Sequence, residues 1–132
     1  MKRGLLLFAH GARDPRWAEP FEEVARRVLV RDPSVVVQLA FLEFMSPTLR
    51  EAGAALALAG CDLVDVVPLF LGAGGHVRKD LPVLLAELSS QYPEMRWQLQ
   101  RAIGEADSVI DAMAIAALRP TPPASNSERS RP

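Results

Sequence analysis

Short apolar runs along the chain alternate with longer segments in which apolar positions recur at helical spacing. Residues 4–9 are continuously apolar and end at His10 and Gly11, which is typical of a strand buried on both faces of a parallel sheet. Residues 35–42 and 62–70 are two more apolar runs, and residues 96–103 alternate enough to predict a fourth strand. The chain therefore predicts four strands, each followed by a polar or amphipathic segment.

The segments between these strands carry the signals of helices. Apolar positions at helical spacing predict a first helix over residues 16–31, ended by Asp32-Pro33-Ser34. Ser46 as N-cap and Pro47 at the first helical position predict a second helix, which runs to about residue 59 and stops at Gly60. Residues 80–91 and 105–118 predict the third and fourth helices. This order predicts an α/β fold, a doubly wound four-stranded parallel sheet of order 2-1-3-4 with helices on both faces.

The length and composition indicate one globular domain with a short tail. The chain has 132 residues, of which 49% are hydrophobic, enough for a packed core. Residues 1–119 carry the periodic pattern. Residues 120–132 are rich in Pro, Ser and Arg without periodicity, so we expect a disordered tail there.

Charge and cysteine usage narrow the range of partners. A net charge of -1 argues against nucleic acid or an anionic membrane as the main partner. No apolar run approaches the length of a membrane span, and the apolar segment at the N-terminus is too short for a signal peptide. One cysteine, Cys61, fits a reducing compartment. We expect a soluble, cytoplasmic protein.

Two histidines, His10 and His76, are the only ones in the chain, and each follows an apolar run. Ligands of open α/β sheets bind beyond the carboxyl ends of the strands, where strand order reverses. Strands one and three are neighbours in the predicted order, roughly 4.8 Å apart, so two imidazoles there can reach one ligand. Glu43 follows the second strand. Such a set suits a divalent transition metal with open coordination positions, or proton abstraction by a neutral imidazole.

The alternative for each of these residues is structural. A lone histidine after a strand is more often a loop residue that hydrogen-bonds to the backbone, and a lone glutamate there is commonly solvated. Two histidines at the ends of neighbouring strands favour a functional site. Gly72, Gly74 and Gly75 either provide positive φ in a turn or let a flat ligand approach the backbone. The loop is not a phosphate loop, because the Gly-Lys-Ser/Thr ending is missing.

Basic residues cluster on or beside the same loops. Taken singly they are ordinary solvated charges. Together they predict a positive rim that attracts carboxylates, to which arginine binds in a bidentate manner. The residues are Arg13, Arg16, Arg50, Arg78 and Lys79.

Three segments, HGARDP, FLEFMSPTL and PLFLGAGGHVRKDLP, resemble those of the small, single-domain sirohydrochlorin cobaltochelatases (CbiX-like) of the class II chelatases. The resemblance covers residues 5–118. It implies a chelatase-like fold and insertion of a divalent metal, usually Co²⁺, into sirohydrochlorin on the way to cobalamin. Close relatives insert iron for siroheme or nickel for coenzyme F430. The metal ion is a substrate, and no other cofactor is expected.

The resemblance also implies roles for individual residues. His10 and His76 match the two active-site histidines, and Glu43 matches an acidic position that joins them at the metal in larger relatives. Because larger relatives carry two such domains in one chain, a homodimer is expected. Ala12 departs from the commoner serine. The substrate-binding residues we predict are Arg13, Arg50, Gly74, Gly75 and Arg78. The apolar residues Phe44, Met45 and Leu71 either pack on the ring face or belong to the core, and for Leu69 the core is favoured.

Two other functions remain open at this stage. The histidine phosphatases also place His-Gly after the first strand, but they need an arginine before that histidine, and Ala9 stands there. A non-catalytic metal-binding or tetrapyrrole-binding protein would use the same histidines. Among chelatases, the choice of cobalt, iron or nickel is not fixed by ligand type.

Overall fold

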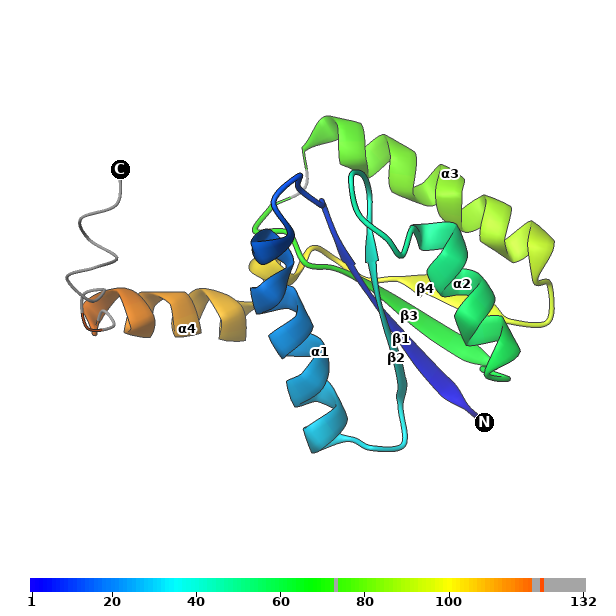
Figure 1. Cartoon of the computed structure of the whole chain (residues 1–132), viewed down its shortest axis with the longest axis horizontal. Helices are drawn as coiled ribbons and strands as arrows, with labels where there is room; N and C mark the ends of the chain where they lie inside the picture. The colour runs from blue at the N-terminus through cyan, green and yellow to red at the C-terminus, as the bar shows by residue number, and fades with distance from the viewer. Residues whose placement is uncertain (73, 120–121, 123–132) are drawn as a thin grey trace.

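The computed structural model describes residues 1–72, 74–119 and 122, with the exception of the His76 side chain. Four parallel strands form one sheet of order β2-β1-β3-β4, which confirms the predicted fold class (Figure 1). The strands are β1 (Arg3–Ala9), β2 (Val36–Phe41), β3 (Leu63–Pro68) and β4 (Arg96–Leu99). The α-helices are α1 (Glu19–Arg31), α2 (Leu49–Leu58), α3 (Gly75–Gln91) and α4 (Asp107–Leu118).

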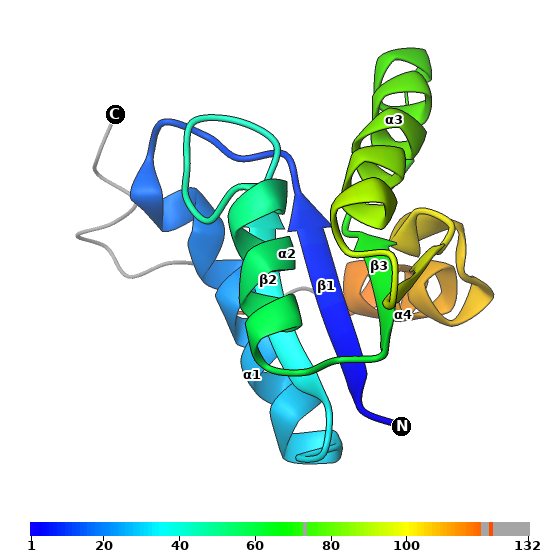
Figure 2. The same ribbon diagram turned by 90° about the vertical axis from the view of Figure 1, so that its right-hand side faces the viewer.

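The two faces of the sheet are covered differently. Helices α2 and α3 lie on one face, where Leu6, Phe8, Val64 and Val66 are fully buried (Figure 2). Helix α1 lies on the opposite face and contacts β2. The prediction of helices on both faces is thus confirmed by three of the four helices. Helix α4 projects away from the sheet (Figure 1).

Two predicted helix starts are wrong by a few residues. Helix α2 begins at Leu49, because Thr48 rather than Ser46 is its N-cap. The Thr48 hydroxyl accepts from the Glu51 amide at 3.2 Å, while the Glu51 carboxylate accepts from the Thr48 amide at 2.9 Å. This capping box fixes the start, and the Ser46-Pro47 peptide, which is cis, precedes it. The predicted stop at Gly60 is confirmed, since Gly60 has a φ of 81°.

Helix α3 begins at Gly75, five residues before the predicted start at Asp80. Gly74 is its N-cap, with an extended backbone (φ −68°, ψ 160°), and the Arg78 amide donates to the Gly74 carbonyl at 3.1 Å. The glycines of this segment suggested a longer loop, but the helix already begins at the last of them, Gly75. His76 therefore lies in the first turn of a helix rather than in a loop.

Two other predicted boundaries also change. The first helix is divided into a short 3-10 helix, η1 (Pro15–Ala18), and α1. Strand β4 ends at Leu99 and is followed by the 3-10 helix η2 (Ile103–Glu105), so α4 starts two residues later than predicted. Gly104 explains the break, because a β-carbon at this position would lie 2.1 Å from the Leu71 carbonyl oxygen. The close approach of two backbones takes the chain out of the sheet.

The predicted disordered tail, residues 120–132, lies outside the described residues apart from Pro122. Within the part of the chain that the structure describes, no helix combines the length and apolarity needed to cross a bilayer.

Candidate functional site

His10 follows the last residue of β1, and its exposed imidazole lies against the ring of Phe70. The ring centroids are 4.2 Å apart and the planes are inclined by 31°. Phe70 is 3% exposed and also makes an edge contact with Phe8, at 6.1 Å between centroids. A buried aromatic ring therefore sets the orientation of an exposed histidine.

The backbone of Glu43 is hydrogen-bonded to the backbone of His10. Its amide donates to the His10 carbonyl at 3.0 Å, and the Leu42 amide donates to the Ala9 carbonyl at 2.9 Å. Gly11 has a φ of 92°, and a β-carbon there would lie 1.9 Å from the Glu43 carbonyl oxygen. The loops after β1 and β2 thus pack backbone to backbone. The Glu43 side chain is exposed, and no hydrogen bond or ion pair joins it to His10 among the described residues.

His76 is the second residue of α3, at the end of the connection that follows β3. Its side chain lies outside the described residues, so the meeting of the two imidazoles stays a prediction. Among the described side chains, no group of three His, Cys, Asp or Glu residues is arranged to hold a metal ion. A site made of His10, Glu43 and His76 is accordingly a proposal, developed below.

The predicted basic rim is partly engaged in internal contacts. The Arg13 guanidinium lies 5.0 Å from the centroid of the Phe44 ring, which is 59% exposed. Arg50 of α2 donates to Glu87 of α3 at 2.8 Å. Arg16 is paired with Asp14 at 3.0 Å.

Two predicted contacts need correction. Met45, expected on the face of a ligand ring, packs against the cluster formed by Ala9, Ala18 and Phe41, because the loop after β2 turns it inward. None of Gly72, Gly74 and Gly75 has a positive φ, so the turn explanation is wrong for them. A β-carbon at any of the three would meet open space, and close approach of a ligand to this backbone stays a prediction.

Cavities open at the carboxyl end of the sheet. One of about 300 Å³ lies between the ends of β1 and β2 and the helices α2 and α3, lined by Phe8, Phe41, Leu42, Thr48, Leu49, Arg50 and Leu84. Another of about 290 Å³ lies beyond β3 and β4, lined by Pro68, Arg78, Leu81, Leu99, Gln100, Arg101, Ala102 and Glu105. Mostly apolar walls with an arginine at the rim suit a flat, largely apolar ligand that carries carboxylates.

Phe70 is the site residue that sequence reasoning missed. The available signal was its position as the last residue of the third apolar run, close to the level at which His10 follows the first run. The Leu69 amide donates to the Phe8 carbonyl at 2.7 Å, so the chain that follows β3 stays beside the end of β1.

The CbiX family model matches residues 4–118, which is nearly the whole described chain. The chain belongs to the CbiX family. The match includes His10, Glu43 and His76, and also the Phe70 that packs on His10.

Curated relatives of this CbiX-family chain are sirohydrochlorin cobaltochelatases. The one from Methanosarcina acetivorans is 36% identical over 85 residues, which cover 64% of this chain and 65% of that protein. The one from Saccharolobus solfataricus is 39% identical over 82 residues, 62% of each chain. The matched segment therefore spans somewhat less than two thirds of either relative.

Solved structures share the whole fold. A CbiX protein from Marinobacter aquaeolei superposes with a TM-score of 0.78 at 29% identity, covering 89% of this chain and 95% of that chain. The sirohydrochlorin chelatase SirB from Bacillus subtilis, solved in complex with cobalt, gives a TM-score of 0.79 at 26% identity. That match covers 91% of this chain but only 51% of SirB.

Proposed function

We propose that the chain is a sirohydrochlorin metal chelatase of tetrapyrrole biosynthesis. It inserts a divalent metal ion into the macrocycle, with Co²⁺ as the preferred metal. One observation carries the proposal. In a CbiX-family chain, an exposed imidazole at the carboxyl end of β1 is oriented by a buried ring, at the edge of the sheet where the apolar cavities open.

Metal insertion exchanges two pyrrole N–H protons for one divalent cation. The reaction therefore needs a base that accepts the protons and a group that delivers the metal ion to the centre of the ring. In our proposal, His10 and His76 hold the incoming ion or accept the two protons. Glu43 is a third metal ligand or relays the protons to solvent. Imidazole nitrogens and a carboxylate suit Co²⁺, Fe²⁺ and Ni²⁺, and a neutral imidazole accepts protons near pH 7.

The macrocycle would lie over the carboxyl ends of the strands. Arg13, Arg50 and Arg78 would bind its carboxylates, and the open backbone at Gly74 and Gly75 would let the ring approach closely. Phe44 and Leu71, which are 59% and 71% exposed, are placed to contact its apolar surface. A ring held bent in this cleft would turn its nitrogen lone pairs toward the entering ion.

Two further assignments belong to this proposal. The match covers 51% of the SirB chain, and this supports a homodimer in which two copies supply what SirB has in one chain. The single cysteine, Cys61, is buried, in keeping with a reducing compartment, and we assign the activity to the cytoplasm. We favour cobalamin biosynthesis as the pathway that uses the product, and siroheme biosynthesis if iron is the preferred metal.

A time course of sirohydrochlorin absorbance, with protein well below the tetrapyrrole concentration, tests the proposal. We expect many turnovers per chain with Co²⁺, faster than without protein, and slower insertion of Fe²⁺ or Ni²⁺. A spectral change that stops at one equivalent of protein would instead identify a binding protein. Hydrolysis of an aryl phosphate, without insertion, would identify a phosphatase.

A further inference from the structure

The cavity of about 290 Å³ beyond β3 and β4, which we call the β4 cavity, has an excess of positive charge. The charged residues among those that line it are Arg78 of α3, Arg101 of the segment after β4, and Glu105 of η2. Two arginines against one glutamate leave one positive charge in excess. Arg78 was predicted to bind the substrate, whereas Arg101 was not. The charge indicates an anionic ligand for this hollow.

The inner wall of the β4 cavity is apolar. Leu81 and Ala102 line it and are only 4% and 5% exposed, while Leu99, at its edge, is 40% exposed. Gln100 also lines the cavity, but its side-chain amide already donates to Asp65 at 2.9 Å. The wall therefore suits methylene groups, and the arginines suit a carboxylate.

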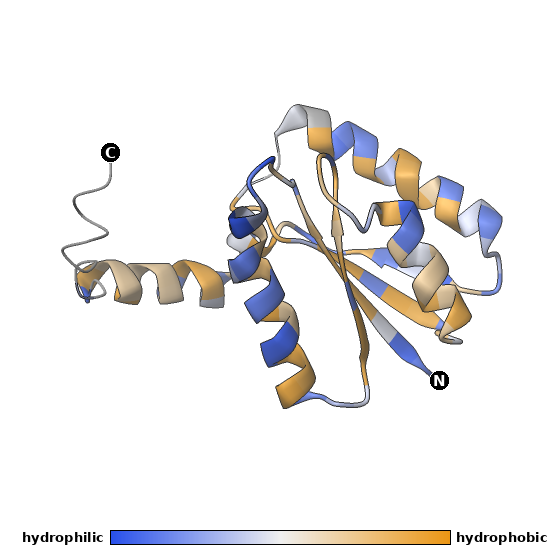
Figure 3. Ribbon diagram, viewed as in Figure 1, coloured by the Kyte–Doolittle hydropathy of each residue, from blue (hydrophilic) through white to orange (hydrophobic). Residues whose placement is uncertain are grey.

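Helix α3 supplies both the wall and part of the charge. Figure 3 shows apolar and hydrophilic positions alternating along this helix. Leu81 is buried against the core, whereas Arg78, three residues earlier, is exposed. The backbone of Arg78 is fixed, because its amide donates to the Gly74 carbonyl at 3.1 Å. Among the described residues, no hydrogen bond or ion pair engages the Arg78 guanidinium.

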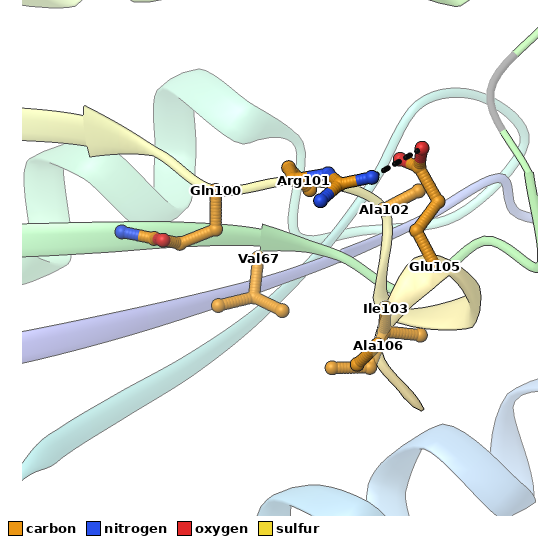
Figure 4. Close-up of a pocket in the computed structure, with 7 residues that line it drawn as sticks. All are labelled: Val67, Gln100, Arg101, Ala102, Ile103, Glu105 and Ala106. Atoms are coloured by element: carbon orange, nitrogen blue, oxygen red, sulfur yellow. Dashed lines mark hydrogen bonds and ion pairs between the residues drawn. The ribbon is translucent and has the colours of Figure 1, made fainter. Parts of the chain in front are cut away.

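Arg101 keeps most of its hydrogen-bond donors free. Within the described part of the chain, its guanidinium makes one bond, from Nη2 to Glu105 at 3.3 Å (Figure 4). The Arg101 side chain is 81% exposed, and an ion pair in such a setting is weak. A guanidinium carries five N–H donors in a planar fork, so Arg101 can still bind a carboxylate through two parallel bonds.

A larger cavity of about 420 Å³ beside this one is a poorer site for a carboxylate (Figure 4). It shares Arg101 and Glu105 with the β4 cavity, but Arg78 does not line it. Its arginine is therefore balanced by its glutamate. Val67 and Ile103, which line the rest of it, are apolar.

The β4 cavity lies within reach of a macrocycle bound at His10. The strand order places β4 two strands from β1, a separation of about 10 Å. The end of β3 joins the two places, because Pro68 lines the cavity and Phe70, two residues later, packs on His10. A carboxylate side chain on the edge of the ring can extend across β3 while the ring centre stays at the histidine.

We propose that Arg78 and Arg101 together bind one carboxylate side chain of the tetrapyrrole in the β4 cavity, with its methylene groups against Leu81. Arg101 is thus a further substrate-binding residue. Arg50 lines the cavity over β1 and β2, so carboxylates on two opposite edges of the ring would be held and the ring could not rotate in its plane. The inference rests on the proposed function and adds the contact that fixes ring orientation.

Steady-state kinetics of Co²⁺ insertion by the full chain, over a range of sirohydrochlorin concentrations, tests this subsite. Arg101→Gln should raise KM by roughly tenfold and change kcat by less than about twofold. Arg101→Lys keeps the charge but not the planar fork, so it should recover only part of the loss. Arg96→Gln is the matched control. Arg96 is exposed at the opposite end of the same strand, and its loss should leave KM unchanged.

A double variant tests whether the two arginines share one carboxylate. Arg78→Gln should also raise KM, and Arg78→Gln with Arg101→Gln should raise it by less than the product of the two single effects. Effects that multiply would mean two separate contacts and would overturn the shared site. An unchanged KM in Arg101→Gln, or an equal rise in Arg96→Gln, would overturn the subsite and leave the proposed function intact. A wild type that neither binds nor metalates sirohydrochlorin would overturn the proposed function, and the subsite with it.

Discussion

The imidazole of His10 and the buried ring of Phe70 lie with their centroids 4.2 Å apart, so a residue that follows β3 orients the histidine that follows β1. This contact is a consequence of the strand order, because β1 and β3 are hydrogen-bonded neighbours and their connections begin side by side. Because the His10 imidazole is held in place before the substrate arrives, it loses less conformational entropy when it binds the metal or accepts a proton.

Phe70→Leu should therefore slow metal insertion by more than its effect on folding explains. Leucine keeps a hydrophobic side chain in the core, and we expect a loss of about 1 to 2 kcal/mol of unfolding free energy. The insertion rate at saturating sirohydrochlorin should fall about tenfold, since His10 loses the ring on which it packs. Urea unfolding and insertion kinetics at 25 °C measure the two effects.

Leu56→Ala is the control for Phe70→Leu. Leu56 is fully buried in the same core, away from His10. This variant should lose at least as much stability, about 2 to 5 kcal/mol, and keep its insertion rate wherever it remains folded. Equal losses of rate in both variants would show that Phe70 acts only through packing.

Gly11→Ala should be far more disruptive than Gly60→Ala. Both glycines have positive φ, 92° and 81°, which costs alanine about 1 to 2 kcal/mol. At Gly60 a β-carbon meets open space, whereas at Gly11 it collides with the Glu43 carbonyl oxygen. We expect an additional loss of about 1 to 3 kcal/mol at Gly11. Similar unfolding free energies for the two variants would mean that the loops after β1 and β2 are not packed as described.

Glu87→Gln should strengthen substrate binding if Arg50 binds a carboxylate of the tetrapyrrole. Glu87 now accepts a hydrogen bond from Arg50 at 2.8 Å and would compete with the substrate for it. Because the pair is exposed, its loss should change stability by less than about 1 kcal/mol. KM for sirohydrochlorin should fall severalfold with kcat unchanged, while Arg50→Gln should raise KM. An unchanged KM in both variants would remove Arg50 from the substrate site.

The capping box of α2 predicts a pH dependence of stability. The Thr48 amide, which donates to the Glu51 carboxylate, lowers the pKa of Glu51 below its usual value. A lowered pKa means that the ionised form stabilises the fold above the unfolded-state pKa, and that this contribution is lost as pH falls through the folded-state pKa. Glu51→Gln should thus be less stable than the wild type at pH 7, and the difference should shrink toward pH 3. Urea unfolding at both pH values measures it, and a difference independent of pH would contradict the role of the charge.

The sequence predicts the strands well because they are continuous apolar runs bounded by turn residues. Helix starts are less well predicted, since neighbouring residues compete as caps. Ser46-Pro47 and Thr48 both carry start signals, and the reciprocal bonds between Thr48 and Glu51 decide between them. The Thr-x-x-Glu pattern was available in the sequence and is the stronger signal.

Other features depend on contacts between distant segments. The break after Leu99 follows from the backbone of Gly104 meeting that of Leu71, and the placement of Phe70 against His10 follows from sheet order. The exposure of α4 was not predictable, because its apolar composition indicates a buried helix. In the site itself, the positions of His10 and Glu43 just beyond β1 and β2 were predicted, and the position of His76 in the first turn of α3 was not.

The rate of Co²⁺ insertion into sirohydrochlorin by His10→Ala and His76→Ala tests the central claim most directly. Both variants should fold as the wild type does, and each should insert metal at least about a hundredfold more slowly, as expected for loss of a metal ligand or catalytic base. The double variant should be little slower than either single one, because the two imidazoles act together. Wild-type insertion rates in either single variant would contradict the proposed site.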